Sequence, residues 1–353
     1  MVNGIFPLIK ILTITAISFI GAIIITPILT HFLYKYKLGK GIRDDGTTPI
    51  FTALHKKKEG TPTMGGILIW VITAVLAIGI LMLTKLFGPD SIFSDFNFLT
   101  RKQTLLPLGV LLFAAIIGLI DDLLGVSKLG KPRKGLRMRH RIIIYTLIAV
   151  IAALWFYFKL DWDLLRIPFL GNFNIGLWYI PIFTFVIVAS AFSTNQTDGL
   201  DGLAGGVLLI AFSAYTVICY SQGRMELATF CGAIVGAILA FLWFNINPAR
   251  FFMGDTGSMS LGITLGVIAM LTNSVFLLPF IGFILLIESL TTIIQIVSKK
   301  IRHKKIFLSA PVHHHFEAKG WPETKVTMRF WIISGVMAVI GLILFFIDST
   351  IFK

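Results

Sequence analysis

The chain has 353 residues, of which 56% are hydrophobic and 14% charged, and its formal net charge is +14 at pH 7. Soluble domains have about 45–50% apolar and about 25% charged residues, so the composition excludes an ordinary soluble protein and indicates a chain largely within hydrocarbon. We interpret residues 1–353 as a single polytopic membrane domain. The two cysteines, Cys219 and Cys231, lie in apolar stretches without metal-site spacing.

Ten apolar segments approach the length of a transmembrane helix, which takes about 20 residues. They lie at residues 5–34, 65–87, 105–124, 142–158, 177–192, 203–220, 227–245, 258–271, 275–297 and 330–347. The sequence therefore predicts an all-α integral membrane protein with about ten transmembrane helices. The first segment is too long for a signal-peptide core, and we expect it to be retained. Residues 167–176, with Gly171-Asn172 between apolar residues, predict a short hairpin.

The 31 Lys and Arg residues are divided unequally between the two faces of this bundle. The loops after the odd-numbered segments hold 23 of them, and the other face, termini included, holds 8. Loops rich in basic residues stay in the cytoplasm, so both termini are expected to be periplasmic or external. Because the charge lies in short loops beside the membrane, we relate it to topology and anionic lipid, and expect no nucleic-acid partner.

Two adjacent carboxylates, Asp121 and Asp122, end the third apolar segment. Ionisable groups at this depth are costly and by default mark a functional site. A solvated helix end is the alternative, but Lys or Arg usually occupy such positions. Adjacent carboxylates suit a divalent metal or a proton acceptor.

The loop after the fifth segment reads Asn195-Gln-Thr-Asp198-Gly-Leu-Asp201-Gly and has no positive charge. Its glycines would let the backbone approach a ligand closely. On a helix, Asp198 and Asp201 would share one face. A polar turn with an Asp cap explains one carboxylate but not all three side chains.

The loop before the eighth segment contains Gly254-Asp255-Thr256-Gly257-Ser258. A carboxylate, hydroxyls and free amides at the start of a helix would suit phosphate or a metal–phosphate group. The preceding aromatic residues could stack on a base or anchor the helix at the interface. Asp and Ser also form ordinary helix caps, so this motif alone is moderately specific.

Three consecutive histidines, His313, His314 and His315, lie in the last loop before Glu317 and Trp321. Consecutive residues on a helix do not all face one metal ion, and no cysteine is near. We therefore expect phosphate contact or proton handling rather than a zinc site.

These motifs together resemble the phospho-N-acetylmuramoyl-pentapeptide-transferases, which belong to the polyprenyl-phosphate N-acetylhexosamine-1-phosphate transferases. The resemblance is carried by residues 60–66, 121–122, 195–206, 245–258 and 311–331. The stretch Pro-Val-His-His-His-Phe-Glu with Gly-Trp-Pro-Glu is the most specific, because relatives that use UDP-GlcNAc have a different histidine motif.

The resemblance implies an active site on the cytoplasmic face of a bacterial cytoplasmic membrane, a Mg²⁺ cofactor and a homodimer. It implies transfer of phospho-MurNAc-pentapeptide from UDP-MurNAc-pentapeptide to undecaprenyl phosphate, which gives lipid I and UMP in peptidoglycan synthesis. Asp255 matches the principal Mg²⁺ ligand, Asp121 a candidate base beside Asp122, and Phe252 a ring that stacks on uracil. The other positions that match catalytic or substrate-contacting residues are Lys58, Thr63, Asn195, Asp198, Asp201, Asn245, Gln295, His313, His314 and His315.

One position departs from the family pattern. Many members have a lysine three residues beyond the acidic pair, where this chain has Gly125. Lys128, Lys131 or Lys134 could take its role.

A relative that moves GlcNAc-1-phosphate and a transporter of anionic metabolites are the alternative functions. A transporter places polar residues near mid-membrane, whereas these cluster at one interface.

Overall fold

The computed structural model describes residues 2–39, 58–101, 103–126 and 136–351. Lys128, Lys131 and Lys134, the candidates for the missing lysine, lie outside these residues. Within the described part, nine helices are long and apolar enough to cross a membrane. They are α1 (Val2–Lys35), α3 (Ile67–Phe87), α5 (Leu105–Gly125), α6 (Met138–Lys159), α7 (Tyr179–Thr197), α8 (Leu203–Ser221), α9 (Met225–Asn245), α10 (Gly254–Leu271) and α14 (Glu323–Ile351).

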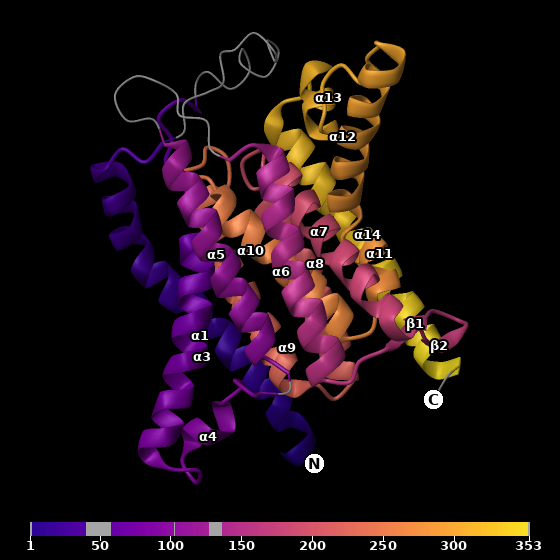
Figure 1. Ribbon diagram of the computed structural model, residues 1–353. Coiled ribbons are helices and arrows are strands. Elements are labelled where there is room, and N and C mark those ends of the chain that lie inside the picture. Colours follow the sequence, from indigo (N-terminus) through magenta and orange to yellow (C-terminus); the bar gives the residue numbers. More distant parts are fainter. Residues whose placement is uncertain (1, 40–57, 102, 127–135, 352–353) are drawn as a thin grey trace.

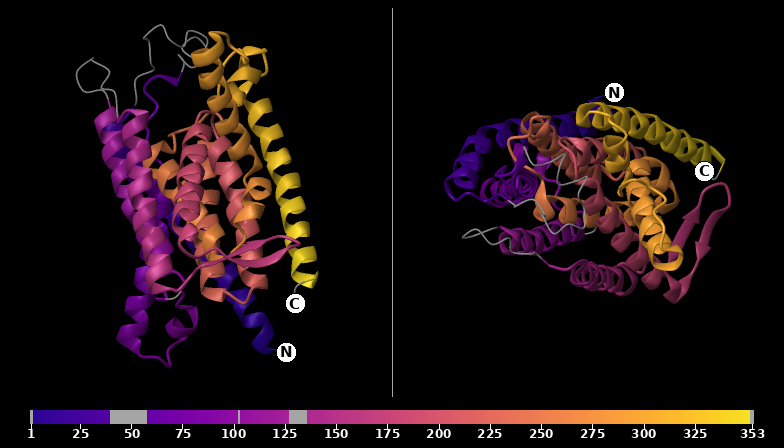
Figure 2. Two further views of the ribbon diagram at one scale, coloured as in Figure 1. Left: turned by 45° about the vertical axis from the view of Figure 1, so that its right-hand side comes forward. Right: turned by 90° about the horizontal axis from the view of Figure 1, so that it is seen from above.

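These helices form one bundle, and both ends of the chain lie at the same end of it (Figure 1). The remaining helical elements are α4 (Ile92–Phe96), the 3-10 turns η2 (Gly176–Trp178) and η3 (Val275–Leu277), α11 (Leu278–Ile281), the 20-residue α12 (Phe283–Arg302) and α13 (Val312–Ala318). Of these, α12 and α13 stand at the end opposite the termini, beside the start of α14 (Figures 1 and 2).

The ninth predicted segment is a broken helix rather than one straight span. The run Val275–Ile281 meets α12 at Gly282 with a bend of 86°. Among the described residues, the candidate spans thus number nine, or ten if the bent pair is counted as one. Buried residues on α12 recur at helical spacing, as at Glu288, Thr291 and Gln295, while its other face exposes isoleucines. This amphipathic pattern keeps α12 packed on one side only.

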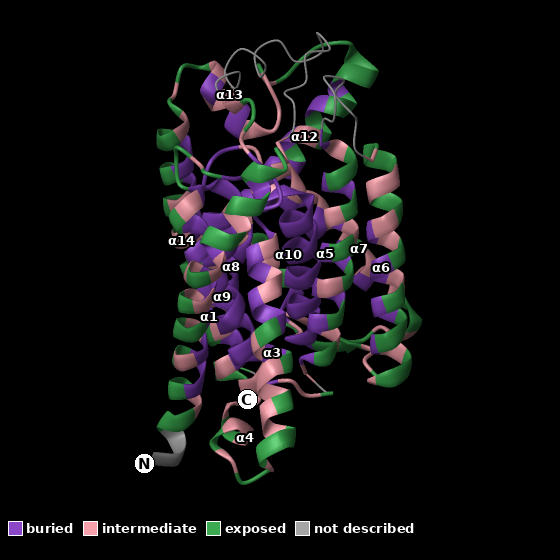
Figure 3. Cartoon of the chain, turned by 90° about the vertical axis from the view of Figure 1, so that its left-hand side faces the viewer, coloured by how far each residue is buried: buried purple, intermediate pink, exposed green. Residues whose placement is uncertain are grey.

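The centre of the bundle is α10, whose residues are all buried (Figure 3). Its glycines allow the close approach of neighbouring helices that lipid-embedded bundles use. A Cβ at Gly262 would lie 2.8 Å from the Cα of Ala191, and one at Gly118 on α5 would lie 2.4 Å from the carbonyl oxygen of Asp255. The peripheral helices α1 and α14 instead expose apolar side chains, as a surface that faces lipid requires.

The predicted hairpin is confirmed. Strands β1 (Leu164–Ile167) and β2 (Gly171–Asn174) pair antiparallel, with Ile167 opposite Gly171. The hairpin lies near the C-terminus (Figure 1). It is held there by Asp348 of α14, whose carboxylate contacts Arg166 Nε at 2.6 Å and accepts the Phe169 N–H at 2.8 Å.

Candidate functional site

The turn between α7 and α8 carries two of the carboxylates that the sequence singled out, Asp198 and Asp201. Asp198 Oδ2 accepts a hydrogen bond from the backbone N–H of Gly254, at 3.1 Å. Asp201 instead forms an ion pair with Lys58, with 2.6 Å between Nζ and Oδ1. Residues 198–202 are a turn and not helix, so the two carboxylates serve different neighbours.

A guanidinium joins three other predicted site residues. Arg141, in the first turn of α6, places Nε 2.8 Å from Asp121 Oδ2 and Nη2 2.9 Å from Asp255 Oδ2. Its Nη1 donates to Asn195 Oδ1 at 3.3 Å, and Asn195 Nδ2 donates to Asp255 Oδ1 at 2.7 Å. Asn195 lies in the last turn of α7 and not in a loop, because this helix continues to Thr197. The ends of α5, α6, α7 and α10 thus meet at one cluster.

The first turn of α10 uses its amides internally, where the sequence led us to expect free ones. The Gly254 N–H donates to Asp198, and the Thr256 N–H donates to Asp122 Oδ2 at 3.0 Å. Carboxylates at a helix N-terminus are stabilised by these amides and by the helix dipole. Gly254 has φ +75°, and a Cβ there would lie 2.5 Å from Asp122 Oδ2 and 2.6 Å from Thr63 Oγ1. Only glycine fits this position.

The segment before α3 pairs with the segment before α10. Gly65 N–H donates to the Phe252 carbonyl at 2.8 Å, and Phe252 N–H donates to the Pro62 carbonyl at 2.8 Å. A Cβ at Gly65 would lie 2.2 Å from the Phe251 ring, so the glycine permits this approach. The pairing places the Lys58 ammonium 5.7 Å from the centroid of the Phe252 ring.

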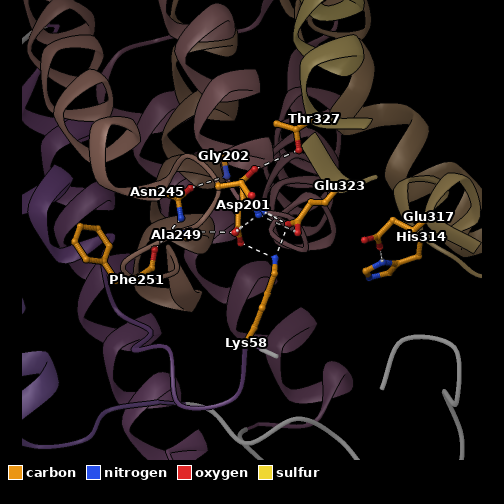
Figure 4. A network of polar contacts seen from close by, with 11 residues as sticks. Lys58, Asp201, Gly202, Asn245, Ala249, Phe251, His314, Glu317, Glu323 and Thr327 are labelled. Carbon is orange, nitrogen blue, oxygen red and sulfur yellow. Dashed lines mark hydrogen bonds and ion pairs between the residues drawn. The ribbon is translucent and has the colours of Figure 1, made fainter. Parts of the chain in front are cut away.

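A second cluster surrounds Lys58 (Figure 4). Besides Asp201, its ammonium contacts Glu323 at the start of α14. Glu323 Oε1 also accepts the Asp201 N–H at 2.6 Å, and Asn247 Nδ2 donates to Asp201 Oδ2 at 2.9 Å. Lys58 therefore lies between two carboxylates and an aromatic ring.

Two predicted substrate-contacting residues hold the backbone of their own neighbourhood. Asn245 accepts the Gly202 N–H at 3.0 Å and donates to the Phe251 carbonyl at 2.8 Å. Gln295 Oε1 accepts the N–H groups of residues 306 and 307, and its Nε2 donates to the carbonyl of Phe307. Both side chains hold loop backbone in this structure.

The three histidines point to three different partners. His313 is fully buried and its Nδ1 lies 2.8 Å from Glu288 Oε2, while its Nε2 packs against Gly199 of the turn. His314 Nδ1 lies 2.7 Å from Glu317 Oε2. Burial, together with the charge of Lys319, lowers the pKa of His315. The neutral ring is thereby favoured, and its Nδ1 accepts the N–H of residue 308 at 3.2 Å.

The sequence interpretation missed Arg141, Glu288, Glu323 and Asn247. Glu288 carried a usable signal, because an acidic residue within an apolar segment marks a functional site or a buried pair. Glu323 belongs to the Gly-Trp-Pro-Glu motif but was not assigned a role. Arg141 was counted only as one of many basic loop residues, and the residues around it do not indicate that its side chain points into the protein.

The cluster around Arg141 offers oxygen ligands from carboxylates and an amide. Mg²⁺ prefers such ligands and is usually held by one or two carboxylates together with substrate phosphates. Among the residues described, no group of three or more His, Cys, Asp or Glu side chains is arranged to hold a metal ion. The oxygen donors Asp121, Asp255 and Asn195 are of the chemical type that a hard divalent cation takes. Carboxylates beside Arg141 and Lys58 are the combination that phosphoryl transfer requires.

Comparison with known proteins places the chain in a class of membrane transferases. Residues 104–273 match the model of glycosyl transferase family 4, which covers the helices that carry Asp121, Asn195 and Asp255. Residues 58–69, which contain Lys58 and Thr63, match signature 1 of the phospho-N-acetylmuramoyl-pentapeptide-transferases.

Curated relatives define the family more closely. The chain is 40% identical over 344 residues to the phospho-N-acetylmuramoyl-pentapeptide-transferase of Chloroflexus aggregans, covering 94% of this chain and 88% of the relative. It is 37% identical over 331 residues to that of a Geobacillus species, covering 92% of this chain and 95% of the relative. The chain belongs to the phospho-N-acetylmuramoyl-pentapeptide-transferase family. It is accordingly a multi-pass membrane protein and a transferase of peptidoglycan synthesis.

Proposed function

We propose that the protein transfers phospho-MurNAc-pentapeptide from UDP-MurNAc-pentapeptide to undecaprenyl phosphate, giving lipid I and UMP. The observation that carries the proposal is the meeting of Asp121, Asn195 and Asp255 around Arg141 at the ends of four helices. A membrane-embedded lipid phosphate would reach this cluster from the bilayer at the end of α5. A soluble nucleotide would reach the adjacent cluster of Lys58 and Phe252 from water.

The proposal assigns Mg²⁺ to the carboxylate end of the site. Asp255 would be its principal ligand, with Asp121 and Asp122 close by, because all three lie at the junction of α5 and α10. The ion would offset the negative charge of the diphosphate. Asp121 would take the proton of the lipid phosphate, and Lys58 would contact the nucleotide phosphates.

We further propose that this end of the bundle faces the cytoplasm of a bacterium and that both termini face outward. The unequal distribution of basic residues supports this orientation. UDP-sugars are made in the cytoplasm, so the orientation also brings the site to its soluble substrate. The homodimer expected from the family remains part of the proposal.

The decisive experiment is UMP release by the purified protein in detergent with Mg²⁺. Three reactions are compared: UDP-MurNAc-pentapeptide with undecaprenyl phosphate, the same nucleotide without lipid, and UDP-GlcNAc with lipid. We expect UMP and a lipid-linked product only in the first reaction. Release from UDP-GlcNAc alone would assign the protein to the relatives that move GlcNAc-1-phosphate. A folded protein that releases no UMP with either nucleotide would refute the proposed activity.

A further inference from the structure

Arg141 lies where the proposed metal ion would meet its principal ligand. Its Nη2 contacts Asp255 Oδ2 at 2.9 Å, and its Nε contacts Asp121 Oδ2 at 2.8 Å. The other Asp255 oxygen accepts the amide of Asn195. The contact is inside the protein, because the side chains of Asp121 and Asp255 are only 4% and 8% exposed.

Two carboxylates that approach each other away from water repel strongly unless a cation lies between them. The planar guanidinium can contact two carboxylates at once, which a lysine ammonium does less well. Arg141 comes from α6, whereas the two carboxylates come from α5 and α10. The cation is therefore supplied by a separate helix, and the carboxylates keep other partners, because Asp121 Oδ1 accepts the Leu136 N–H and Asp255 Oδ1 accepts the Asn195 amide.

We propose that Arg141 is the resident cation of the metal-free site and competes with the divalent ion for Asp255 and Asp121. This inference rests on the metal assignment in the proposed function. A metal ion held by Asp255 Oδ2 would compete for the oxygen that Arg141 Nη2 contacts. Metal binding would displace the guanidinium from Asp255, and Arg141 would then be available to an anionic group.

The test measures binding of Mn²⁺, a spectroscopic substitute for Mg²⁺, by electron paramagnetic resonance in the absence of substrate. Arg141→Gln keeps a polar side chain of similar length but removes the competing charge. We expect it to bind Mn²⁺ at least about tenfold more tightly, which corresponds to the loss of one charge-assisted hydrogen bond. Its metal-free form should melt at a lower temperature than the wild type, and Mn²⁺ should raise its melting temperature further.

Arg139→Gln is the matched control. Arg139 lies in the same helical turn, carries the same charge, is exposed, and contacts His140 rather than a carboxylate. It should change Mn²⁺ affinity by less than about twofold, since exposed charges are well screened. Equal or weaker Mn²⁺ binding by Arg141→Gln than by the wild type overturns the proposal.

Two further outcomes are separable. If Arg141→Gln does not fold, Arg141→Lys is measured in its place. A lysine ammonium contacts two carboxylates less well than a guanidinium, so this variant should compete less with Mn²⁺ and bind it more tightly than the wild type. A gain in Mn²⁺ affinity below about threefold counts against competition. Absence of saturable Mn²⁺ binding in every folded variant overturns both this inference and the metal assignment. UMP release by chelator-treated enzyme would then show whether the transferase activity itself stands.

Discussion

Asp122 Oδ2 accepts the backbone N–H of Thr256 at 3.0 Å, which joins the acidic pair at the end of α5 to the first turn of α10. The carboxylates of the candidate site are thus held by backbone amides as well as by side chains. Such contacts fix their positions, because backbone donors in a helix cannot rotate away.

Gly254→Ala should disable the site. The residue has φ +75°, and its Cβ would meet Asp122 and Thr63. A non-glycine residue in this conformation costs about 1–3 kcal/mol before any steric clash. We expect a lower melting temperature and loss of most UMP release. Gly79→Ala is the control, because nothing lies within 4 Å of a Cβ at that helical position. Similar behaviour of the two variants would contradict this account.

Asp255→Asn should abolish transfer while the protein stays folded. Asn keeps the shape and a hydrogen-bonding oxygen but removes the charge that meets Arg141. Losing a metal contact in the transition state costs several kcal/mol, so activity should fall below about a tenth of wild type. The measurement is UMP release as a function of Mg²⁺ concentration, with size-exclusion chromatography as the folding control. Normal Mg²⁺ dependence with substantial activity would exclude Asp255 as the principal ligand.

Phe252→Ala and Asp121→Asn should affect different kinetic constants. The Phe252 ring lies beside Lys58, and stacking on a base is worth about 1–3 kcal/mol in nucleic-acid complexes. Its loss should raise the Michaelis constant for the nucleotide. Loss of Asp121 as a proton acceptor should lower turnover at saturating nucleotide. Steady-state kinetics with each substrate varied in turn separates the two. If the Michaelis constant for the nucleotide is unchanged in Phe252→Ala, Phe252 does not stack on the base. If Asp121→Asn turns over normally, Asp121 has only a structural role.

Asp348→Ala should reduce stability without reducing the activity of folded protein. Asp348 holds Arg166 and the Phe169 amide, and losing such partners costs about 1–3 kcal/mol. It lies 25 residues along α14 from Glu323, which is roughly 38 Å at the rise of an α-helix. Asp163→Ala is the control in the same region, since its contact with Asn174 is exposed. Thermal unfolding measures the loss of stability, and UMP release per folded molecule measures activity. A catalytic defect in Asp348→Ala would show that the hairpin end of the bundle is coupled to the candidate site at the other end.

A tag at either terminus should be cleaved only from outside the cell. The two termini lie at the end of the bundle away from α12 and α13 (Figure 1). The basic residues predict that this end faces outward. The measurement is protease accessibility of a C-terminal tag in intact cells and in inverted vesicles. Cleavage only in inverted vesicles would reverse the proposed orientation.

The sequence by itself determined the elements and the candidate residues. Long apolar runs predict spans because bilayer thickness fixes their length, and this holds for nine helices of the described chain. The hairpin at Gly171 followed from local turn chemistry. The motifs around Asp121, Asp198, Asp255 and His313 identified the family, because family membership is encoded in residue type and spacing.

Only the tertiary structure decided how those residues combine. Asp198 and Asp201 are three residues apart, yet one meets α10 and the other meets Lys58 and α14. The sequence did not reveal that Arg141 lies between Asp121 and Asp255, or that Glu288 meets His313. These contacts join residues 20 to 143 positions apart and depend on how closely glycine-lined helices pack. Hydrophobic periodicity determines which segments form helices. How closely those helices pack then determines which charged side chains come into contact.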